Sequence, residues 1–194
     1  GIKGELPFFS RFMASGMTEQ LGPMQERGLE LFDKNLQKKL AVYLIDSVGV
    51  VDYSGGFYLY VSTSSKISQI SNKSKSMMDH IENFVQKNSI RTTGSPFTIY
   101  HKFDQENGTT MFSVGYPIAE RIMSQDSDIL TGYMERGTYF KTILTGAYTN
   151  SQEAWEKAMF DAENLKEYRV VESGEPFEIY VNDADNTPNP AQLI

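Results

Sequence analysis

A seven-residue motif occurs twice in this chain, and the two copies are 80 positions apart. The first copy reads Gly94-Ser95-Pro96-Phe97-Thr98-Ile99-Tyr100, and the second reads Gly174-Glu175-Pro176-Phe177-Glu178-Ile179-Tyr180. Five of the seven residues are identical, at one constant offset, since 174−94 and 180−100 both give 80. A fixed period of this length indicates that one structural unit is present twice.

The residues before the motif repeat as well. Gly56 and Tyr58 align with Gly137 and Tyr139 at an offset of 81, since 137−56 and 139−58 both give 81. Apolar residues with helical spacing align at the same offset: Met78, Ile81 and Phe84 with Met159, Ala162 and Leu165. We therefore expect an α+β fold made of a duplicated strand-helix-strand-strand unit. Its two copies, residues 42–120 and 127–194, should be related by a pseudo-two-fold axis. They should form a curved antiparallel sheet with helices on one face and a ligand pocket on the other.

Alternating and β-branched runs predict strands at 42–51, 57–63, 97–101, 111–118, 129–134, 138–144 and 177–181. Asn107-Gly108 is a strong hairpin signal between two of them. Helices are predicted at 77–87 and from residue 150 or 151, after a polar stretch at 64–76 that we expect to be a loop and helix entry. The repeat also predicts a last strand at 191–198, and the sequence ends at Ile194, so we expect either a truncated chain or a short last strand.

Residues 1–40 lie outside the repeat. Leu29, Phe32, Leu36 and Leu40 recur at spacings of three and four, which predicts an amphipathic helix over 23–40. We expect residues 1–40 to be a helical segment or the remnant of an upstream domain, followed by the repeated domain at 41–194.

Charge and composition narrow the function. A net charge of −7 argues against direct contact with nucleic acid, which depends on Lys and Arg. The chain has no Cys and two His, so thiolate sites and His-based metal clusters are not expected, and no cofactor is predicted. It has no apolar run long enough for a membrane span. We expect a cytoplasmic bacterial protein.

Strand alternation predicts a candidate site. Phe177 and Ile179 should lie beneath the helices, and the opposite face should carry a carboxylate among aromatic rings. The expected ligand-binding residues are Tyr58, Tyr60, Tyr100, Tyr139, Glu178 and Tyr180. Such a site suits an aromatic, lipophilic or cationic small molecule. The alternatives are an exposed Glu178 paired with a Lys and tyrosines that only pack on the strands.

Signals for catalysis are weak. A Ser/His/Asp triad cannot be assembled from the spacing, and no glycine motif for phosphate is present. Asp46 and Asp52 are expected on the surface. If the chain is an enzyme, Glu178 and Tyr139 are the acid-base pair that we would choose.

The chain also resembles a known family over residues 42–194. The resemblance rests on Gly137-Thr138-Tyr139, on Thr145-Gly146-Ala147-Tyr148, and on Pro176-Phe177-Glu178-Ile179-Tyr180-Val181-Asn182-Asp183 before Thr187-Pro188. These look like the GyrI-like small-molecule-binding domain, the effector-binding half of AraC/Rob-type and BmrR-type regulators. The resemblance implies a concave pocket with a central Glu, for which Glu178 is the candidate. It also implies that some relatives hydrolyse cyclopropane-containing toxins.

Two features differ from that family pattern. Its usual closing strand would begin where this sequence stops, and no helix-turn-helix segment is present. Residues 3–40, with Leu6-Pro7-Phe8-Phe9, resemble the end of a START-like lipid-binding domain (SRPBCC). The leading hypothesis is a non-catalytic module that binds a small molecule and acts through a fused or separate regulatory domain. The alternatives are hydrolysis of a reactive, cyclopropanoid-type small molecule and a purely structural interaction domain.

Overall fold

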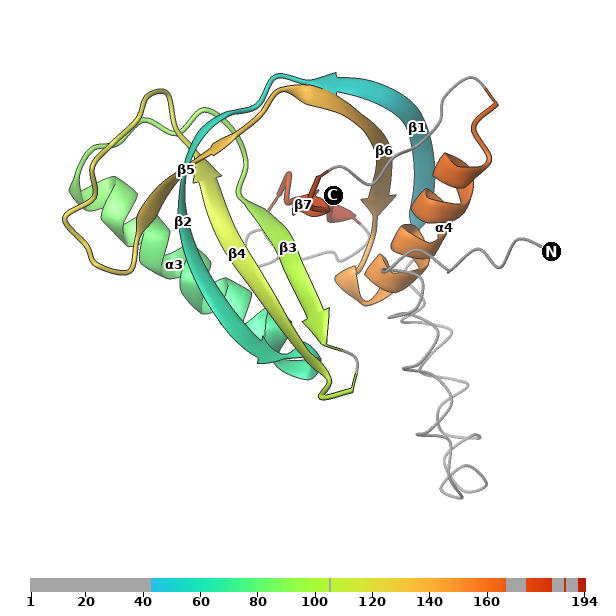
Figure 1. Ribbon diagram of the computed structural model, residues 1–194, viewed down its shortest axis with the longest axis horizontal. Coiled ribbons are helices and arrows are strands. Elements are labelled where there is room, and N and C mark those ends of the chain that lie inside the picture. Colours follow the sequence, from blue (N-terminus) through green and yellow to red (C-terminus); the bar gives the residue numbers. More distant parts are fainter. Residues whose placement is uncertain (1–42, 105, 167–173, 183–186, 188–191) are drawn as a thin grey trace. The chain divides into compact units, whose positions relative to one another are not determined.

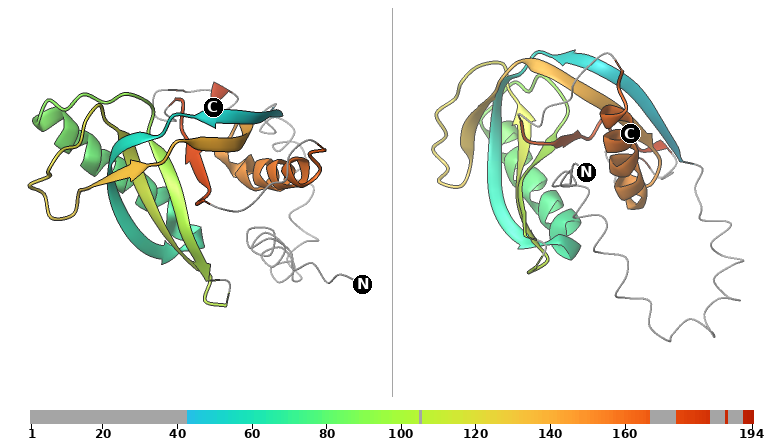
Figure 2. Two further views of the ribbon diagram at one scale, coloured as in Figure 1. Left: turned by 45° about the horizontal axis from the view of Figure 1, so that its top comes forward. Right: turned by 45° about the vertical axis from the view of Figure 1, so that its right-hand side comes forward.

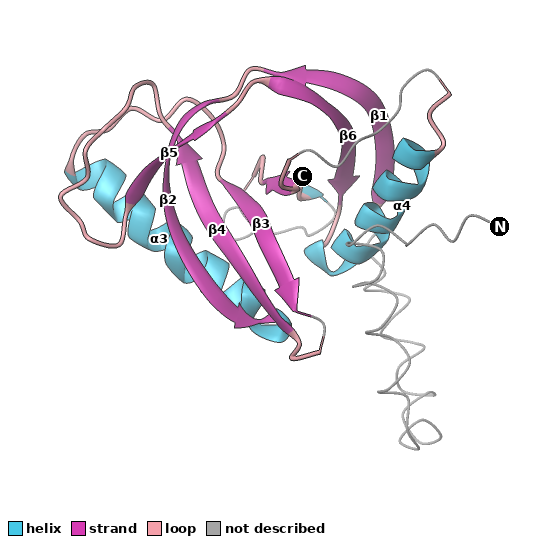
Figure 3. Cartoon of the chain, viewed as in Figure 1, coloured by secondary structure: helices cyan, strands magenta, loops and turns pink. Residues whose placement is uncertain are grey.

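The computed structural model describes residues 43–104, 106–166, 174–182, 187 and 192–194 (Figure 1). The described part is an α+β fold with antiparallel strands and two α-helices (Figure 3). Its elements are β1 (Leu44–Tyr53), β2 (Gly56–Lys66), α3 (Ile70–Lys87), β3 (Phe97–Asp104), β4 (Thr109–Pro117), β5 (Leu130–Met134), β6 (Gly137–Thr145), α4 (Ser151–Glu163) and β7 (Phe177–Ile179). Neither α-helix in these residues has the length and hydropathy of a membrane-crossing segment.

The chain divides into two compact units, which are described separately. One contains the described parts of 50–139 and 171–182, and the other contains those of 1–49, 140–170 and 183–194. In the first unit, a five-stranded sheet has the order β5-β2-β4-β3-β7. Helix α3 packs along β2 and β4 of this sheet, on one of its faces (Figure 2).

The core of this unit lies between α3 and the sheet. Met77 and Ile81 of α3 are buried, because they fall on the face of the helix that turns toward the strands. Opposite them, fully buried side chains come from the two central strands: Leu59, Phe112 and Val114. Burying large apolar side chains of this kind contributes about 1.5–3 kcal/mol each.

Strands β1 and β6 pair as a two-stranded sheet. Their residues 44–49 and 140–145 belong to the other unit, which also contains α4. Tyr43 and Ser47 donate hydrogen bonds of 2.5 Å to Glu153 and Asp161 of this helix. Glu153 also places negative charge in the first turn of α4, where it is favourable. These polar contacts hold α4 to the start of β1.

The pairing of β3 with β7 joins the two copies of the sequence motif. Thr98 lies opposite Glu178, and Phe97 and Ile99 lie opposite Ile179 and Phe177. Beyond the strand ends, the Tyr100 N–H donates to the Pro176 carbonyl and the Tyr180 N–H donates to the Pro96 carbonyl. The two bonds are equivalent under the repeat: the donors Tyr100 and Tyr180 are 80 positions apart, and so are the acceptors Pro96 and Pro176.

The predicted strands and helices are found, with some changes at their ends. Residues 64–66 continue β2 and α3 begins at Ile70, so the polar stretch at 64–76 is not a loop. Ser74 is buried on the inner side of α3, which shows how tertiary packing keeps a Ser-rich segment helical. The helix predicted at 23–40 lies outside the described residues. Of the strand predicted at 191–198, residues 192–194 are described, and they do not form a strand.

Candidate functional site

The strand register assigns side chains to the two faces of the five-stranded sheet. Tyr60 and Phe97 both lie opposite Gly115, so these three residues share one face. Thr98 and Val61 both lie opposite Val114, and Glu178 lies opposite Thr98, so these residues point to the other face. The second face is the one that α3 covers, because Leu59 and Val114 are buried there. We call it the helix face, and we call the first the aromatic face.

This register corrects the sequence prediction that the six site residues share one face. Phe177 and Ile179 do not lie beneath the helix; they pair with Ile99 and Phe97 on the aromatic face. Tyr100 and Glu178 therefore point to the helix face, away from Tyr58 and Tyr60. The prediction was wrong because alternation within one strand does not say how the phases of different strands match.

On the helix face, three of the predicted residues form a hydrogen-bonded group. The hydroxyls of Tyr100 and Tyr180 each donate to Oε2 of Glu178, at 3.0 Å. The Tyr180 hydroxyl also lies 3.2 Å from the hydroxyl of Thr98, which is fully buried. A carboxylate that accepts from two hydroxyls is well satisfied in a partly buried position.

The environment keeps both phenols of this group protonated. Burial raises the pKa of Tyr100 and Tyr180 well above the ordinary value for tyrosine, and the charge of Glu178 raises it further. Tyr100 also stacks on Phe103, with ring centroids 5.6 Å apart. A one-residue bulge at His101 puts both rings on the helix face.

On the aromatic face, Tyr58 is the centre of a cluster of rings. Its centroid lies 5.4 Å from that of Tyr60 and 5.2 Å from that of Phe97. Two glycines make room for these rings. A Cβ on Gly132 would come within 2.5 Å of the Tyr58 ring, and one on Gly115 within 2.7 Å of the Phe97 ring.

A second group of rings lies around Phe177, which also points to the aromatic face. Tyr53 and Tyr139 contact Phe177 at centroid distances of 5.4 and 5.3 Å, and they contact each other at 5.9 Å. Burial raises the pKa of Tyr53, and Tyr139 contributes to this shift. The aromatic face therefore carries rings from several strands: Tyr53, Tyr58, Tyr60, Phe97, Tyr139 and Phe177.

Polar side chains continue the aromatic face along β2, β4 and β3. Glu175 lies 2.7 Å from Nδ1 of His101, and Nε2 of His101 lies 2.5 Å from the hydroxyl of Ser113. Ser113 in turn contacts the hydroxyl of Ser62 at 2.6 Å. When His101 is neutral, its Nδ1–H donates to the carboxylate, Ser113 donates to Nε2, and Ser62 donates to Ser113.

Glu175 is also close enough to the tyrosines to affect them. Burial raises the pKa of Tyr58, and the neighbouring Tyr60 and the charge of Glu175 raise it further. The Glu175 side chain is 54% exposed, so a ligand can reach it. Glu175, which contacts His101, is thus a carboxylate on the aromatic face, whereas Glu178 points to the helix face.

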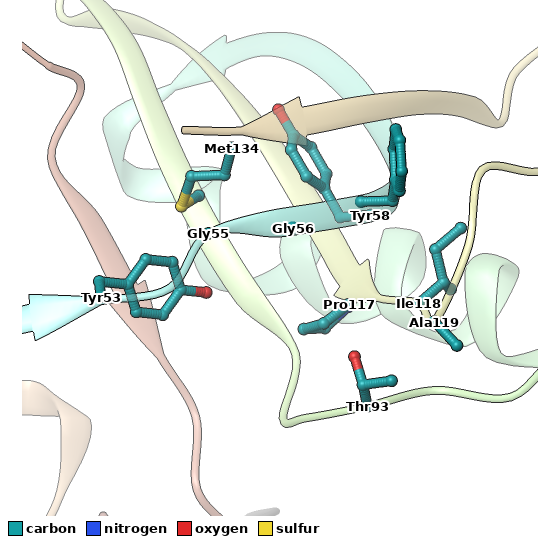
Figure 4. Close-up of a pocket in the computed structure, with 10 residues that line it drawn as sticks. Tyr53, Gly55, Gly56, Tyr58, Thr93, Pro117, Ile118, Ala119 and Met134 are labelled. Atoms are coloured by element: carbon teal, nitrogen blue, oxygen red, sulfur yellow. The ribbon is translucent and has the colours of Figure 1, made fainter. Parts of the chain in front are cut away.

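A groove of about 240 Å³ opens where the Gly55-Gly56 turn meets the end of β4 (Figure 4). Tyr53 and Tyr58 line it, and Pro117, Thr93 and Met134 are among the other lining residues (Figure 4). Gly55 has a positive φ, and a Cβ there would come within 2.2 Å of the Met134 carbonyl oxygen. The close turn therefore requires glycine.

The structure thus divides the predicted site residues into two sets. Tyr58, Tyr60 and Tyr139 belong to the ring clusters of the aromatic face, whereas Tyr100, Glu178 and Tyr180 form the group on the helix face. Sequence reasoning missed Tyr53, Phe97, Phe177, His101 and Glu175. Gly115 and Gly132 are a usable signal, because a glycine inside a strand marks a close approach by another group.

The predicted catalytic pair is not assembled. Tyr139 packs on Phe177, and Glu178, the next residue in β7, points to the opposite face. Glu178 instead contacts Tyr100 and Tyr180. The spacing does not predict a Ser/His/acid arrangement, yet Ser113, His101 and Glu175 are in contact. Ser113, however, is 1% exposed, which hides its hydroxyl from a substrate.

Comparison with solved structures shows what this fold is similar to. EcmrR in its complex with DNA, from the EcmrR-RPo cryo-EM structure, aligns with a TM-score of 0.63 and 15% identity over 86% of this chain. The chain spans 60% of the length of that protein. The crystal structure of the EcmrR C-terminal domain aligns with a TM-score of 0.62 and 16% identity, covering 78% of this chain and 92% of that domain. Neither a known protein family nor a curated protein sequence matches the chain.

Proposed function

We propose that this chain is an effector-binding module that takes a flat aromatic or lipophilic small molecule, with a preference for cations. Its binding surface consists of the half-buried rings of the aromatic face, whereas the buried Phe97 supports Tyr58. Rings bind flat ligands by stacking and cations by cation-π attraction, which contributes about 0.5–2 kcal/mol per contact. The observation that carries the proposal is the gathering of rings from several strands on the face of the sheet opposite α3.

A preference for positive charge follows from Glu175. Its carboxylate contacts His101 on the aromatic face, and its side chain is more than half exposed, so it can also contact a cation that stacks on the rings. The chain as a whole carries a net charge of −7, which also favours approach of a cation. A neutral ligand of the same shape would keep the stacking and lose this charge contact.

The similarity to the EcmrR C-terminal domain supports a regulatory setting. EcmrR is seen in complex with DNA, and this chain aligns with only part of that protein. We infer that ligand occupancy of the module is passed to a separate or fused regulatory segment. The acidic charge of the chain makes direct DNA contact by the module itself unfavourable.

A duplicated origin of the module is supported by the strand pairing. The motif copies pair with each other in β3 and β7, and Thr98 and Glu178, which face each other, are 80 positions apart. In addition, β1 pairs with β6 while β2 pairs with β5, and these two pairs are equivalent under the repeat. Both relationships are those expected of a pseudo-two-fold axis between the copies.

The test is a binding comparison with two probes of similar shape and different charge. Isothermal titration at mildly alkaline pH would compare 1-methylquinolinium, a cation, with 4-methylquinoline, which is neutral there. We expect both to bind and the cation to bind more tightly. Replacing Glu175 with Gln should weaken only the cation, whereas Tyr58→Ala should weaken both by about tenfold, equivalent to about 1.4 kcal/mol.

A matched control is Tyr133→Ala. Tyr133 lies opposite Phe57 in the same sheet and is 51% exposed. This substitution therefore removes a tyrosine without altering the aromatic face. Binding by this variant should equal that of the unchanged chain. The proposal fails if neither probe binds, or if Tyr58→Ala and Tyr133→Ala affect binding equally.

A further inference from the structure

A helix and a distant loop bring three possible metal ligands together. His80 lies in α3, and Asp126 and Asp128 lie in the segment between β4 and β5. One ligand atom from each of the three lies within 4.8 Å of the other two. All three residues belong to the unit that contains the five-stranded sheet, and none is part of the aromatic face.

The distance between the side chains of His80 and Asp126 fits two ligands of one metal ion better than a direct hydrogen bond between them. Nε2 of His80 and Oδ2 of Asp126 are 3.6 Å apart. This is longer than an N–H···O hydrogen bond, which is about 2.7–3.2 Å. Two ligands of a tetrahedral ion with bonds of about 2.0–2.1 Å are separated by about 3.3–3.4 Å. The pair therefore needs little movement to bind an ion between its members.

The loop is held in place by contacts that do not involve His80. Ile129 is fully buried, and the Thr131 hydroxyl donates to the Ile122 carbonyl. The Asp128 N–H donates to Oδ1 of Asp126 at 2.9 Å, which leaves Oδ2 of Asp126 directed to His80. The backbone of the loop and the Asp126 carboxylate are thus held in place without an ion, which lowers the entropic cost of binding one.

We propose that His80, Asp126 and Asp128 bind one divalent first-row transition ion, such as Zn²⁺, with water in the remaining coordination positions. An imidazole nitrogen with two carboxylates suits such ions, whereas Mg²⁺ and Ca²⁺ favour sites made of oxygen alone. The ion would fasten the loop between β4 and β5 to α3. Because it binds the folded chain, it would also raise the free energy of unfolding, by an amount that grows with the logarithm of the ion concentration above the dissociation constant.

The test uses the whole chain without an affinity tag, after treatment with a chelator and dialysis. Titration with Zn²⁺ should show one site per chain, and Co²⁺ should give the visible absorption of a bound ion. His80→Ala should weaken Zn²⁺ binding at least about tenfold, as should the double variant Asp126→Asn, Asp128→Asn, because each loses direct ligands. Mg²⁺ should bind much more weakly than Zn²⁺.

The control is Glu82→Gln, which removes one negative charge from the same helix. Glu82 is two residues from His80 and so points to a different side of α3. Its zinc affinity should stay within about twofold of the unchanged chain. Thermal unfolding without metal would confirm that each variant is folded. Absence of zinc binding, or equal binding by His80→Ala and the unchanged chain, would overturn the proposal.

Discussion

Thr98 and Glu178 face each other across the β3–β7 ladder, and they occupy the same position in the two copies of the sequence motif. One copy has a hydroxyl at this place and the other has a carboxylate. The Tyr180 hydroxyl contacts both, at 3.2 and 3.0 Å. The hydrogen-bonded group of Tyr100, Glu178 and Tyr180 on the helix face therefore depends on positions 98 and 178, at which the two copies of the motif differ.

Replacing Glu178 with Gln should destabilise the fold. The change removes the charge that strengthens two hydrogen bonds and adds an amide N–H₂ beside two hydroxyl donors. We expect a loss of about 1–2 kcal/mol in the free energy of unfolding, measured with urea. Glu120→Gln, at an exposed loop residue, is the control and should change stability by less than about 0.5 kcal/mol. Equal stability of both variants would show that the group contributes nothing.

The two buried phenols predict a loss of stability at alkaline pH. Their folded-state pKa values lie above the ordinary value, so the folded chain retains protons that the unfolded chain releases. Stability from this source is complete below the unfolded pKa of about 10 and falls as pH rises toward the folded pKa.

The measurement is urea unfolding over a series of pH values from neutral to above 10. The double variant Tyr100→Phe, Tyr180→Phe should be less stable than the unchanged chain at neutral pH, because it lacks the hydrogen bonds to Glu178. Its stability should fall less steeply at alkaline pH, because the two groups no longer titrate. Parallel curves for the two proteins would contradict the assigned pKa direction.

Gly132→Ala and Gly115→Ala should each destabilise the aromatic face. The new methyl group would collide with the ring of Tyr58 or Phe97, and both rings are packed against neighbours. We expect losses of about 1–3 kcal/mol in thermal or urea unfolding. Gly174→Ala is the control, because a Cβ there meets no atom within 4 Å. If all three variants are equally stable, the glycines do not make room for the rings.

Ser113→Ala should cost more stability than Ser62→Ala. Ser113 is buried and contacts His101, so its loss leaves an imidazole nitrogen without its partner in a partly buried place. Ser62 is exposed, and water can replace its contact. The expected losses are about 1–2 kcal/mol for Ser113→Ala and less than about 0.5 kcal/mol for Ser62→Ala. The reverse order would show that the chain of hydrogen bonds is not ordered as described.

Local elements were predictable from neighbouring residues. Asn107-Gly108 makes the turn between β3 and β4, where Gly108 has a φ of +60° and Asp104 accepts two hydrogen bonds from Asn107. The spacing of Met78, Ile81 and Phe84 predicted one face of α3 only in part: Ile81 is buried, whereas Met78 and Phe84 are half-buried and Met77 is the buried methionine. These features depend on contacts between residues close in sequence, so a short window contains the necessary information.

The composition of the candidate site was only partly predictable. Tyr58, Tyr60 and Tyr139 were chosen for their residue type and do lie in ring clusters. Alternation alone predicts that Glu178 shares their face, whereas Glu175, in the Gly-Pro turn, is the carboxylate that contacts His101 on the aromatic face. No periodicity describes a turn residue, so its direction could not be inferred.

By itself, the sequence determined where most of the described strands and helices lie. It also determined that tyrosines occupy alternating strand positions and that the motif occurs twice. Only the tertiary structure decided which side of each strand joins which face. A shift of one residue in register, or a bulge such as that at His101, turns every following side chain to the opposite face. Register depends on packing between distant segments, which is why Glu178 lies with Tyr100 and Tyr180 while the rings around Tyr58 form the aromatic face.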